Sequence, residues 1–376
     1  MIKRILTVAA ATFLSTQACV AQTPVPATEK VVHPFTLEDF YRQDKLLDQQ
    51  VEQIFSRMSD EQRVGQMIIP AAGRLGKPDA QLDELARKGW MGGIILLNGT
   101  VESFKNYVHR FDSISKANGH LPLVYSADAE PSLINRKISG SVQVPKTAEL
   151  KDTTEVMAVA HTIAHQLKDI GILYNYAPVT DLSLQNAAIG NRSFGSDPAH
   201  VERMNRVFIT TSQADGVATT AKHFPGHGLV KGDTHKKLVF IDGPMKEVDV
   251  YKGLIDAGVL SIMIGHIAVQ NNPKYNTNGQ PATLSRAIVT DLLKKEMGFK
   301  GIITTDAMNM GAVAAIPNSS LLAAQAGNDI ILMPNNEKES VFSILAQMDK
   351  DAAFRQQVYD SVKKIIRFKL ALGVIR

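Results

Sequence analysis

Short apolar runs recur along the chain between stretches with helical spacing. The runs are five to seven residues long and predict strands at 65–70, 92–97, 121–127, 173–178, 216–222, 259–265, 301–305 and 329–333. Between most of them, apolar residues return every three or four positions, which predicts helices at 80–88, 101–117, 152–169, 198–215, 246–257, 285–297 and 321–326. Continuously apolar strands are typical of a parallel sheet covered on both faces.

Eight alternating strand and helix units over about 270 residues predict an α/β fold, a (β/α)8 TIM-type barrel that forms a single catalytic domain. An open doubly wound sheet is the alternative. No Gly-x-Gly-x-x-Gly turn follows an early strand, which argues against the dinucleotide-binding form of that fold. A last helix at 354–372 would close the barrel on its outside. In the amphipathic segment 51–66, Ser59-Asp60-Glu61-Gln62 resembles a helix cap, so two helices are expected to meet there.

The N-terminus has the pattern of an export signal. Lys3-Arg4 precedes an apolar run at 5–14, roughly ten residues, which is too short to span a bilayer. Cleavage before Cys19, the only cysteine, would leave a lipid-anchored protein, whereas cleavage after Ala21 would release a soluble one. The position of Cys19 favours the first, so residues 1–21 are predicted to be a lipoprotein-type signal peptide. The protein would then be exported to the bacterial cell envelope, periplasmic or membrane-anchored.

Residues 22–50 contain three prolines among polar neighbours and are predicted to be a linker or extension, with the barrel domain at 51–376.

The overall composition is consistent with a large globular domain. The chain is 44% hydrophobic, enough for a large core, and 41 basic residues oppose 37 acidic ones. The charges are interspersed, without an arginine-rich run, so nucleic-acid binding is not indicated. A single cysteine allows no intrachain disulfide, and we expect a monomer.

One segment concentrates the polar chemistry of the chain. Among its glycines and Pro225 it carries a lysine, an aspartate and three histidines, namely Lys222, His223, Asp233, His227 and His235. Because proline and glycine suit neither a helix nor a central strand, residues 223–235 are predicted to form a loop. Loops held by a rigid scaffold are where chemistry is often placed. Solvated surface histidines are the alternative, which the density of ionisable groups argues against.

Polar residues also follow several predicted strands. In a (β/α)8 barrel the active site lies at the carboxyl ends of the strands, so these residues should converge: Asp128, Glu130, Asp181, Lys222, His223, His266 and Asp306. Asp306 follows its strand directly, a good position for a nucleophile. Asp233 lies two residues before His235, and a carboxylate beside an imidazole orients the ring and favours its protonated form. Such a set suits hydrolysis of a glycosidic bond.

These motifs resemble the β-N-acetylhexosaminidase branch of glycoside hydrolase family 3. The resemblance rests on Lys222-His223-Phe224-Pro225-Gly226-His227-Gly228, followed after four residues by Asp233-Thr234-His235, and it covers most of residues 51–376. Further matching segments lie at 58–67, 190–195, 262–266, 281–285 and 298–306.

The resemblance implies a retaining exo-β-N-acetylglucosaminidase on a (β/α)8 barrel. Asp306 would be the nucleophile that forms a glycosyl-enzyme intermediate, and Asp233 with His235 would supply the acid/base. The residues that bind the sugar would be Asp128, Arg192, Lys222, His223 and His266. The expected substrates are oligosaccharides ending in N-acetylglucosamine, either peptidoglycan fragments or chitin-like chains.

The chain departs from the family pattern after its third predicted strand. The family usually has Asp-x-Glu-Gly-Gly-Arg, whereas this chain has Asp128-Ala129-Glu130-Pro131-Ser132-Leu133. Contacts at the far side of the sugar or with the leaving group are therefore expected to differ. A carbohydrate-binding lipoprotein without catalysis is one alternative function. Phosphorolysis by an enzyme of the same family is another, because a histidine repels phosphate less than a carboxylate does.

No cofactor or metal is predicted. The spacing of His223, His227 and His235 fits neither a helical His-Glu-x-x-His motif nor a zinc ribbon. The sequence contains no cofactor-binding motif that would support an oxidoreductase on a similar barrel. The glycines at 226–232 are expected to let the loop bring His235 to a bound sugar, while His227 is left with a structural role.

Overall fold

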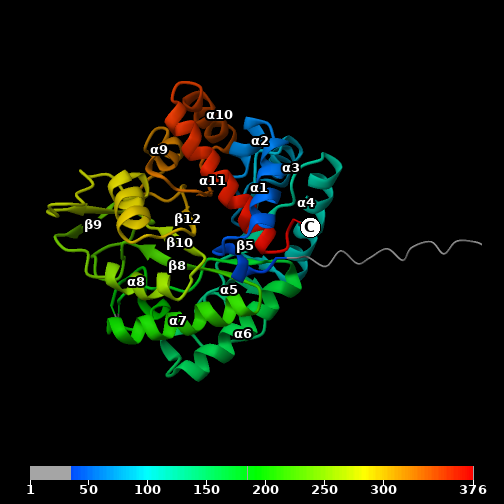
Figure 1. Ribbon diagram of the computed structural model, residues 1–376. Coiled ribbons are helices and arrows are strands. Elements are labelled where there is room, and N and C mark those ends of the chain that lie inside the picture. The colour runs from blue at the N-terminus through cyan, green and yellow to red at the C-terminus, as the bar shows by residue number, and fades with distance from the viewer. Residues whose placement is uncertain (1–34, 184, 376) are drawn as a thin grey trace, which may run out of the picture. The chain divides into compact units, whose positions relative to one another are not determined.

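The computed structural model describes residues 35–183 and 185–375 (Figure 1). Both predicted cleavage positions and Cys19 lie outside these residues, so export and lipid anchoring stay predictions. Across the described part of the chain, no helix combines the length and the apolar character needed to cross a bilayer.

Every predicted strand region contains a strand, and the strands pair in parallel. Their bounds are β1 Ile68–Ile69, β2 Ala71–Ala72, β3 Gly93–Leu96, β5 Val124–Ala127, β7 Tyr174–Asn175, β8 Ala218–Phe224, β10 Ser261–Ile264, β12 Ile302–Thr305 and β13 Ile331–Leu332. Seven of them form one sheet in the order β2-β3-β5-β7-β8-β10-β12. The result is a curled parallel sheet with helices, consistent with a TIM-like barrel.

Two short contacts join the ends of this sheet. β1 pairs with β13 through Ile68–Ile331 and Ile69–Leu332. On the other side of β13, Thr304 of β12 bridges to Ile330. Pro70, which has no N–H to donate, separates β1 from β2, so one extended stretch of chain pairs with β13 through β1 and with β3 through β2.

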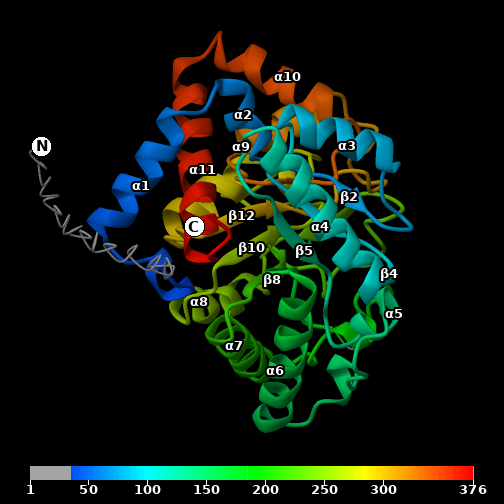
Figure 2. The same cartoon turned by 90° about the vertical axis from the view of Figure 1, so that its right-hand side faces the viewer.

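Helices surround the sheet (Figures 1 and 2). They are α1 Lys45–Ser56, α2 Asp60–Gly65, α3 Asp79–Lys88, α4 Val101–Ala117, α5 Ile134–Lys137, α6 Thr153–Ile170, α7 Pro198–Ala214, α8 Val248–Asp256, a π-type helix at Ala287–Glu296, α9 Ser319–Ala326, α10 Glu337–Met348 and α11 Ala352–Ala371. Single 3-10 turns lie at Leu37–Phe40, Thr147–Glu149, Gly190–Arg192 and Ala282–Leu284. Most predicted helices agree with these bounds within a few residues, but α1 begins at Lys45 and not at residue 51, and α5 and α10 were not predicted.

The packed part of the chain begins earlier than residue 51. α1 and α2 meet at Ser59, as the capping pattern predicted, because Gln62 N donates to Ser59 Oγ at 3.2 Å and Ser59 N donates to Gln62 Oε1 at 3.0 Å. However, Phe35 and Phe40 are also buried, and Arg367 of α11 donates to Phe40 O at 2.6 Å. Residues 35–50 therefore pack on the fold and do not belong to the linker predicted at 22–50.

β8 extends two residues beyond its predicted end. The strand was predicted to end at residue 222, with Lys222 and His223 at the strand end, yet Phe224 also pairs with Ile264 of β10, and Gly265 N donates to Phe224 O at 2.8 Å. Pro225 ends the strand, so His223 is fixed by the sheet. Two further parallel pairs were not predicted: β9 Val239–Asp242 with β11 Ile267–Gln270, and β4 Gly99–Thr100 with β6 Ile138–Ser139.

Candidate active site

Residues from the ends of four strands meet on one side of the sheet. Asp128 follows β5, Lys222 and His223 end β8, His266 lies just after β10, and Asp306 follows β12. Burial raises the pKa of Asp306, but His223, His266 and Lys222 outweigh it and bring the pKa below its usual value. Asp306 is therefore a carboxylate at neutral pH. Its Oδ1 accepts from Ala307 N at 2.8 Å, and its side chain is partly exposed.

A chain of alternating charges forms one wall of the site. Lys222 Nζ lies 2.8 Å from Asp128 Oδ1 and 2.6 Å from Glu130 Oε1. Lys137 Nζ donates to Asp128 Oδ2 at 2.7 Å. Arg192 binds Glu130 with two parallel bonds, Nε to Oε2 at 2.8 Å and Nη2 to Oε1 at 2.7 Å. Bidentate pairs of this kind are strong and directional, so the wall is rigid before any ligand arrives.

The same contacts determine which groups remain for a substrate. Burial raises the pKa of Asp128, but Lys137 and Lys222 hold it well below its usual value. Burial likewise opposes the ionisation of Glu130, yet Arg192 and Lys222 lower its pKa to about 2. An ammonium has three N–H donors and a guanidinium five. Since Arg192 also donates Nη1 to Ala188 O at 3.1 Å, Lys222 keeps one free donor and Arg192 keeps two.

Asp181 orients His223 and the base of the following loop. His223 Nδ1 lies 2.7 Å from Asp181 Oδ2, while Asp181 Oδ1 accepts from His223 N at 3.2 Å and from His227 N at 2.8 Å. His223 Nε2 is then the ring nitrogen left for a ligand. His227 Nε2 lies 3.0 Å from Thr234 Oγ1, so this buried ring links the base of the loop to its tip.

His266 has a different environment from the other predicted sugar-binding residues. Its Nδ1 lies 2.7 Å from Thr283 Oγ1, and its Nε2 lies 3.0 Å from Ala307 O, next to Asp306. Burial lowers its pKa, which favours the neutral ring. Both nitrogens thus have protein partners, and the geometry gives His266 the role of supporting the segment that carries Asp306.

The Asp233–His235 pair lies at the tip of the loop after β8. Asp233 Oδ1 accepts from His235 N at 2.9 Å and lies 2.7 Å from Nδ1 of the ring, which leaves Nε2 for a substrate. The imidazole is 63% exposed. The loop is tied to the segment after Asp306, because Gly311 N donates to His235 O at 3.2 Å and Ala312 N donates to Thr234 O at 3.3 Å. The pair is thereby held on the side of the site that carries Asp306.

Two residues that hold the base of the loop were not predicted. Glu247 accepts from Leu182 N at 2.6 Å, Leu229 N at 3.0 Å and Gly228 N at 3.2 Å. Burial, followed by the charge of Asp181, raises the pKa of Glu247 to about 8. Asn186 Nδ2 contacts three loop carbonyls, those of His227, Gly228 and Val230. The loop is thus fixed at base and tip, and residues 231–233 connect the two fixed parts.

Substitution of Gly311 should displace the part of this loop that carries Asp233 and His235. A Cβ at Gly311 would lie 2.8 Å from both His235 O and Lys236 O, too close for the present backbone. Because a misplacement of about 1 Å can cost roughly 100-fold in rate, Gly311→Val should lower kcat for a glycoside about 10- to 100-fold. The exposed Ala315→Val in the same segment is the matched control. Wild-type kcat in Gly311→Val would show that loop docking does not matter.

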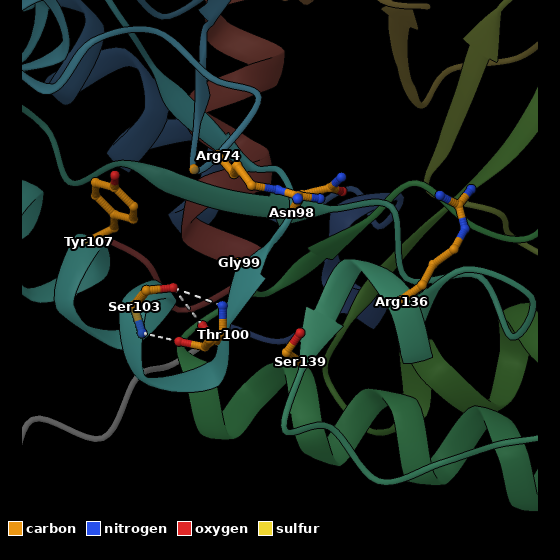
Figure 3. A pocket seen from close by; sticks show the side chains of 9 residues that line it. Arg74, Asn98, Gly99, Thr100, Ser103, Tyr107, Arg136 and Ser139 are labelled. Carbon is orange, nitrogen blue, oxygen red and sulfur yellow. Dashed lines mark hydrogen bonds between the residues drawn. The ribbon is translucent and has the colours of Figure 1, made fainter.

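A separate pocket of about 510 Å³ lies between the segments that carry Arg74, Asn98, Tyr107 and Arg136 (Figure 3). None of the predicted site residues lines it. Arg74 and Arg136 extend into it, and neither has a carboxylate at ion-pair distance among the residues that the structure describes. Arg136 directly precedes Lys137, which contacts Asp128. The pocket therefore offers two unpaired cations near the charged wall.

Comparison with known proteins identifies the class to which this site belongs. The model described as "Glycosyl hydrolase family 3 N terminal domain" matches residues 59–368. The chain belongs to glycoside hydrolase family 3.

Individual relatives agree with this assignment. The chain is 29% identical over 310 residues to a beta-hexosaminidase of Vibrio cholerae serotype O1, covering 77% of this chain and 91% of that protein. It is 29% identical over 283 residues to beta-hexosaminidase A of Pseudoalteromonas piscicida, covering 68% of this chain but only about half (47%) of that protein. The crystal structure of beta-N-acetylhexosaminidase from Beutenbergia cavernae superposes with a TM-score of 0.74 at 27% identity, covering 83% of this chain and 98% of that one.

Proposed function

We propose that the protein is a retaining exo-β-N-acetylglucosaminidase that forms a single barrel domain and removes terminal β-linked N-acetylglucosamine. The observation that carries the proposal is the pairing of an ionised Asp306 on a strand end with an Asp233–His235 pair tied to the segment after it. The names of the relatives, beta-hexosaminidase and beta-N-acetylhexosaminidase, support this substrate class.

In this mechanism Asp306 attacks the anomeric carbon, and the bond to the leaving oxygen breaks as His235 donates a proton to that oxygen. A glycosyl–aspartate ester and neutral His235 result. His235 then removes a proton from water, which attacks the same carbon and releases Asp306. Two inversions retain the configuration. Asp233 stabilises the cationic imidazole and keeps Nε2 turned to the reacting oxygens.

The charged wall would hold the sugar ring. Asp128 can accept from ring hydroxyls, while the remaining donors of Lys222 and Arg192 can bind hydroxyl or amide oxygens. Because both cations are already locked by carboxylates, the sugar meets a preformed surface, which reduces the entropy lost on binding.

The test is release of 4-nitrophenol from its N-acetyl-β-D-glucosaminide, compared with an Asp306→Asn control. No turnover above that control, on this substrate or on muropeptides, would refute the proposal. Sugar binding by calorimetry without turnover would instead favour the non-catalytic lipoprotein. The product formed with and without phosphate distinguishes hydrolysis from phosphorolysis.

Of the two substrate classes, the pocket with Arg74 and Arg136 favours peptidoglycan fragments, which carry carboxylates, over neutral chitin-like chains. A hydrogen bond to a charged group contributes about 1.5–3 kcal/mol. Arg74→Ala should therefore lower kcat/KM at least about tenfold for a disaccharide of N-acetylglucosamine and N-acetylmuramic acid. The kcat/KM for N,N′-diacetylchitobiose should change less than about twofold. The exposed Arg57→Ala is the matched control. Equal losses on both disaccharides would contradict a charge-specific role.

Export to the cell envelope and lipid anchoring at Cys19 complete the proposal. They rest on the N-terminal sequence alone.

A further inference from the structure

A group of metal-binding side chains lies far from the candidate active site, on two helices at the outside of the barrel. His161 and His165 are four residues apart on α6 and therefore share one face of that helix. Asp215 ends α7. The two helices lie side by side in both views (Figures 1 and 2), which brings the carboxylate to the two imidazoles.

The three side chains converge closely. His161 Nδ1 lies 2.5 Å and His165 Nε2 lies 4.0 Å from Asp215 Oδ2. One ligand atom from each residue can be chosen so that all lie within 4.8 Å of one another. A tetrahedral ion with bonds of about 2.0–2.1 Å separates its ligands by about 3.3 Å. The imidazoles are 48% and 68% exposed, so both rings are free to rotate by the small amount that this requires.

We propose that His161, His165 and Asp215 bind one divalent transition-metal ion, with Zn²⁺ as the preferred ion, and that this ion links α6 to α7. Two imidazoles and one carboxylate with a water molecule make a four-coordinate set typical of zinc. Mg²⁺ and Ca²⁺ prefer sites made of oxygen ligands alone. The Lys168 ammonium donates to the main-chain carbonyl Asp215 O at 2.6 Å, whereas the Asp215 carboxylate is paired with the two histidines.

The location gives the ion a structural role. Asp215 lies three residues before Ala218, the first residue of β8, so the site is at the amino ends of the strands. Asp306 and the charged wall are at the carboxyl ends, on the opposite side of the barrel. Zn²⁺ at this position would stabilise the folded chain by binding to it preferentially and would leave the proposed glycosidase chemistry unchanged.

The test uses the full chain stripped of metal with EDTA. We expect Zn²⁺ to bind with one-to-one stoichiometry in calorimetry, Co²⁺ to give the visible absorption of a four-coordinate site, and saturating Zn²⁺ to raise Tm by about 3–5 °C. His165→Gln should weaken Zn²⁺ binding at least about tenfold and abolish the shift in Tm. Because His165 is largely exposed, this variant is expected to fold. His109→Gln, an exposed histidine on α4, is the matched control and should bind like the wild type.

His161→Gln provides a second variant with the same expected loss of Zn²⁺ binding. Absence of Zn²⁺ binding to the wild-type chain at 100 µM, about the range that a weak surface site would still show, would overturn the proposal. So would unchanged binding in both histidine variants, which would place the ion elsewhere. If both histidine variants bind Zn²⁺ unchanged, a His223→Gln variant tests whether the ion binds in the candidate active site.

Discussion

Asp306→Asn is expected to lower kcat on 4-nitrophenyl N-acetyl-β-D-glucosaminide by about 10⁴-fold or more, the range for loss of a catalytic nucleophile. The amide has the shape of the carboxylate, and its oxygen can still accept from Ala307 N, as Asp306 Oδ1 does at 2.8 Å. The amide lacks the negatively charged oxygen that attacks the anomeric carbon. The local structure should therefore persist while the first chemical step fails.

Two controls separate chemistry from folding in this prediction. Asp291→Asn removes a half-exposed carboxylate elsewhere and should leave kcat unchanged. Azide added to an Asp306→Ala variant should restore turnover and give a glycosyl azide of inverted configuration, because a small anion can occupy the vacated space. Turnover by Asp306→Asn within tenfold of the wild type would exclude Asp306 as the nucleophile.

His235→Ala is expected to have the second-largest effect, about 10²- to 10⁴-fold on kcat, the usual contribution of a general acid or base. The loss should depend on the leaving group. N,N′-diacetylchitobiose has a poor leaving group that needs the proton, so its kcat should fall most. 4-Nitrophenol leaves with little protonation, so its initial burst should survive while the later attack of water is slow.

The measurement for His235→Ala is a comparison of burst and steady-state rates on the two substrates. His200→Ala removes a partly exposed histidine of α7 and should behave as the wild type on both substrates. Equal losses in burst and steady state, whichever the substrate, would indicate that His235 only shapes the site. Asp233→Asn should show the same pattern with a smaller loss, since the ring remains but its cation loses a charged partner at 2.7 Å.

The sequence predicted the strands well because a sheet covered on both faces requires continuous apolar runs. Asp128, Lys222 and Asp306 were found for the same reason, since each stands where such a run ends. Glu247 and Asn186 were missed because single polar residues in loops carry no periodic signal, and their partners are main-chain atoms of distant segments.

The role of Lys137 could not be predicted either. It contacts Asp128 only because the short helix α5 turns it back toward β5. His266 was recognised as part of the site, but its partners Thr283 and Ala307 come from two other segments of the chain, 17 and 41 residues further on. The position of His266 after a predicted strand therefore assigned it to the site, but it did not show which atoms its two ring nitrogens contact.

The pairing of β1 with β13 has a consequence for how the chain acquires its fold. Ile68 and Ile331 come from opposite ends of the described chain, and contacts between such distant segments cost loop-closure entropy before they stabilise anything. We expect this pairing to form late, after the C-terminal part has been synthesised. Until that point the sheet would lack the contact that joins β1 to β13, so its two ends would remain apart.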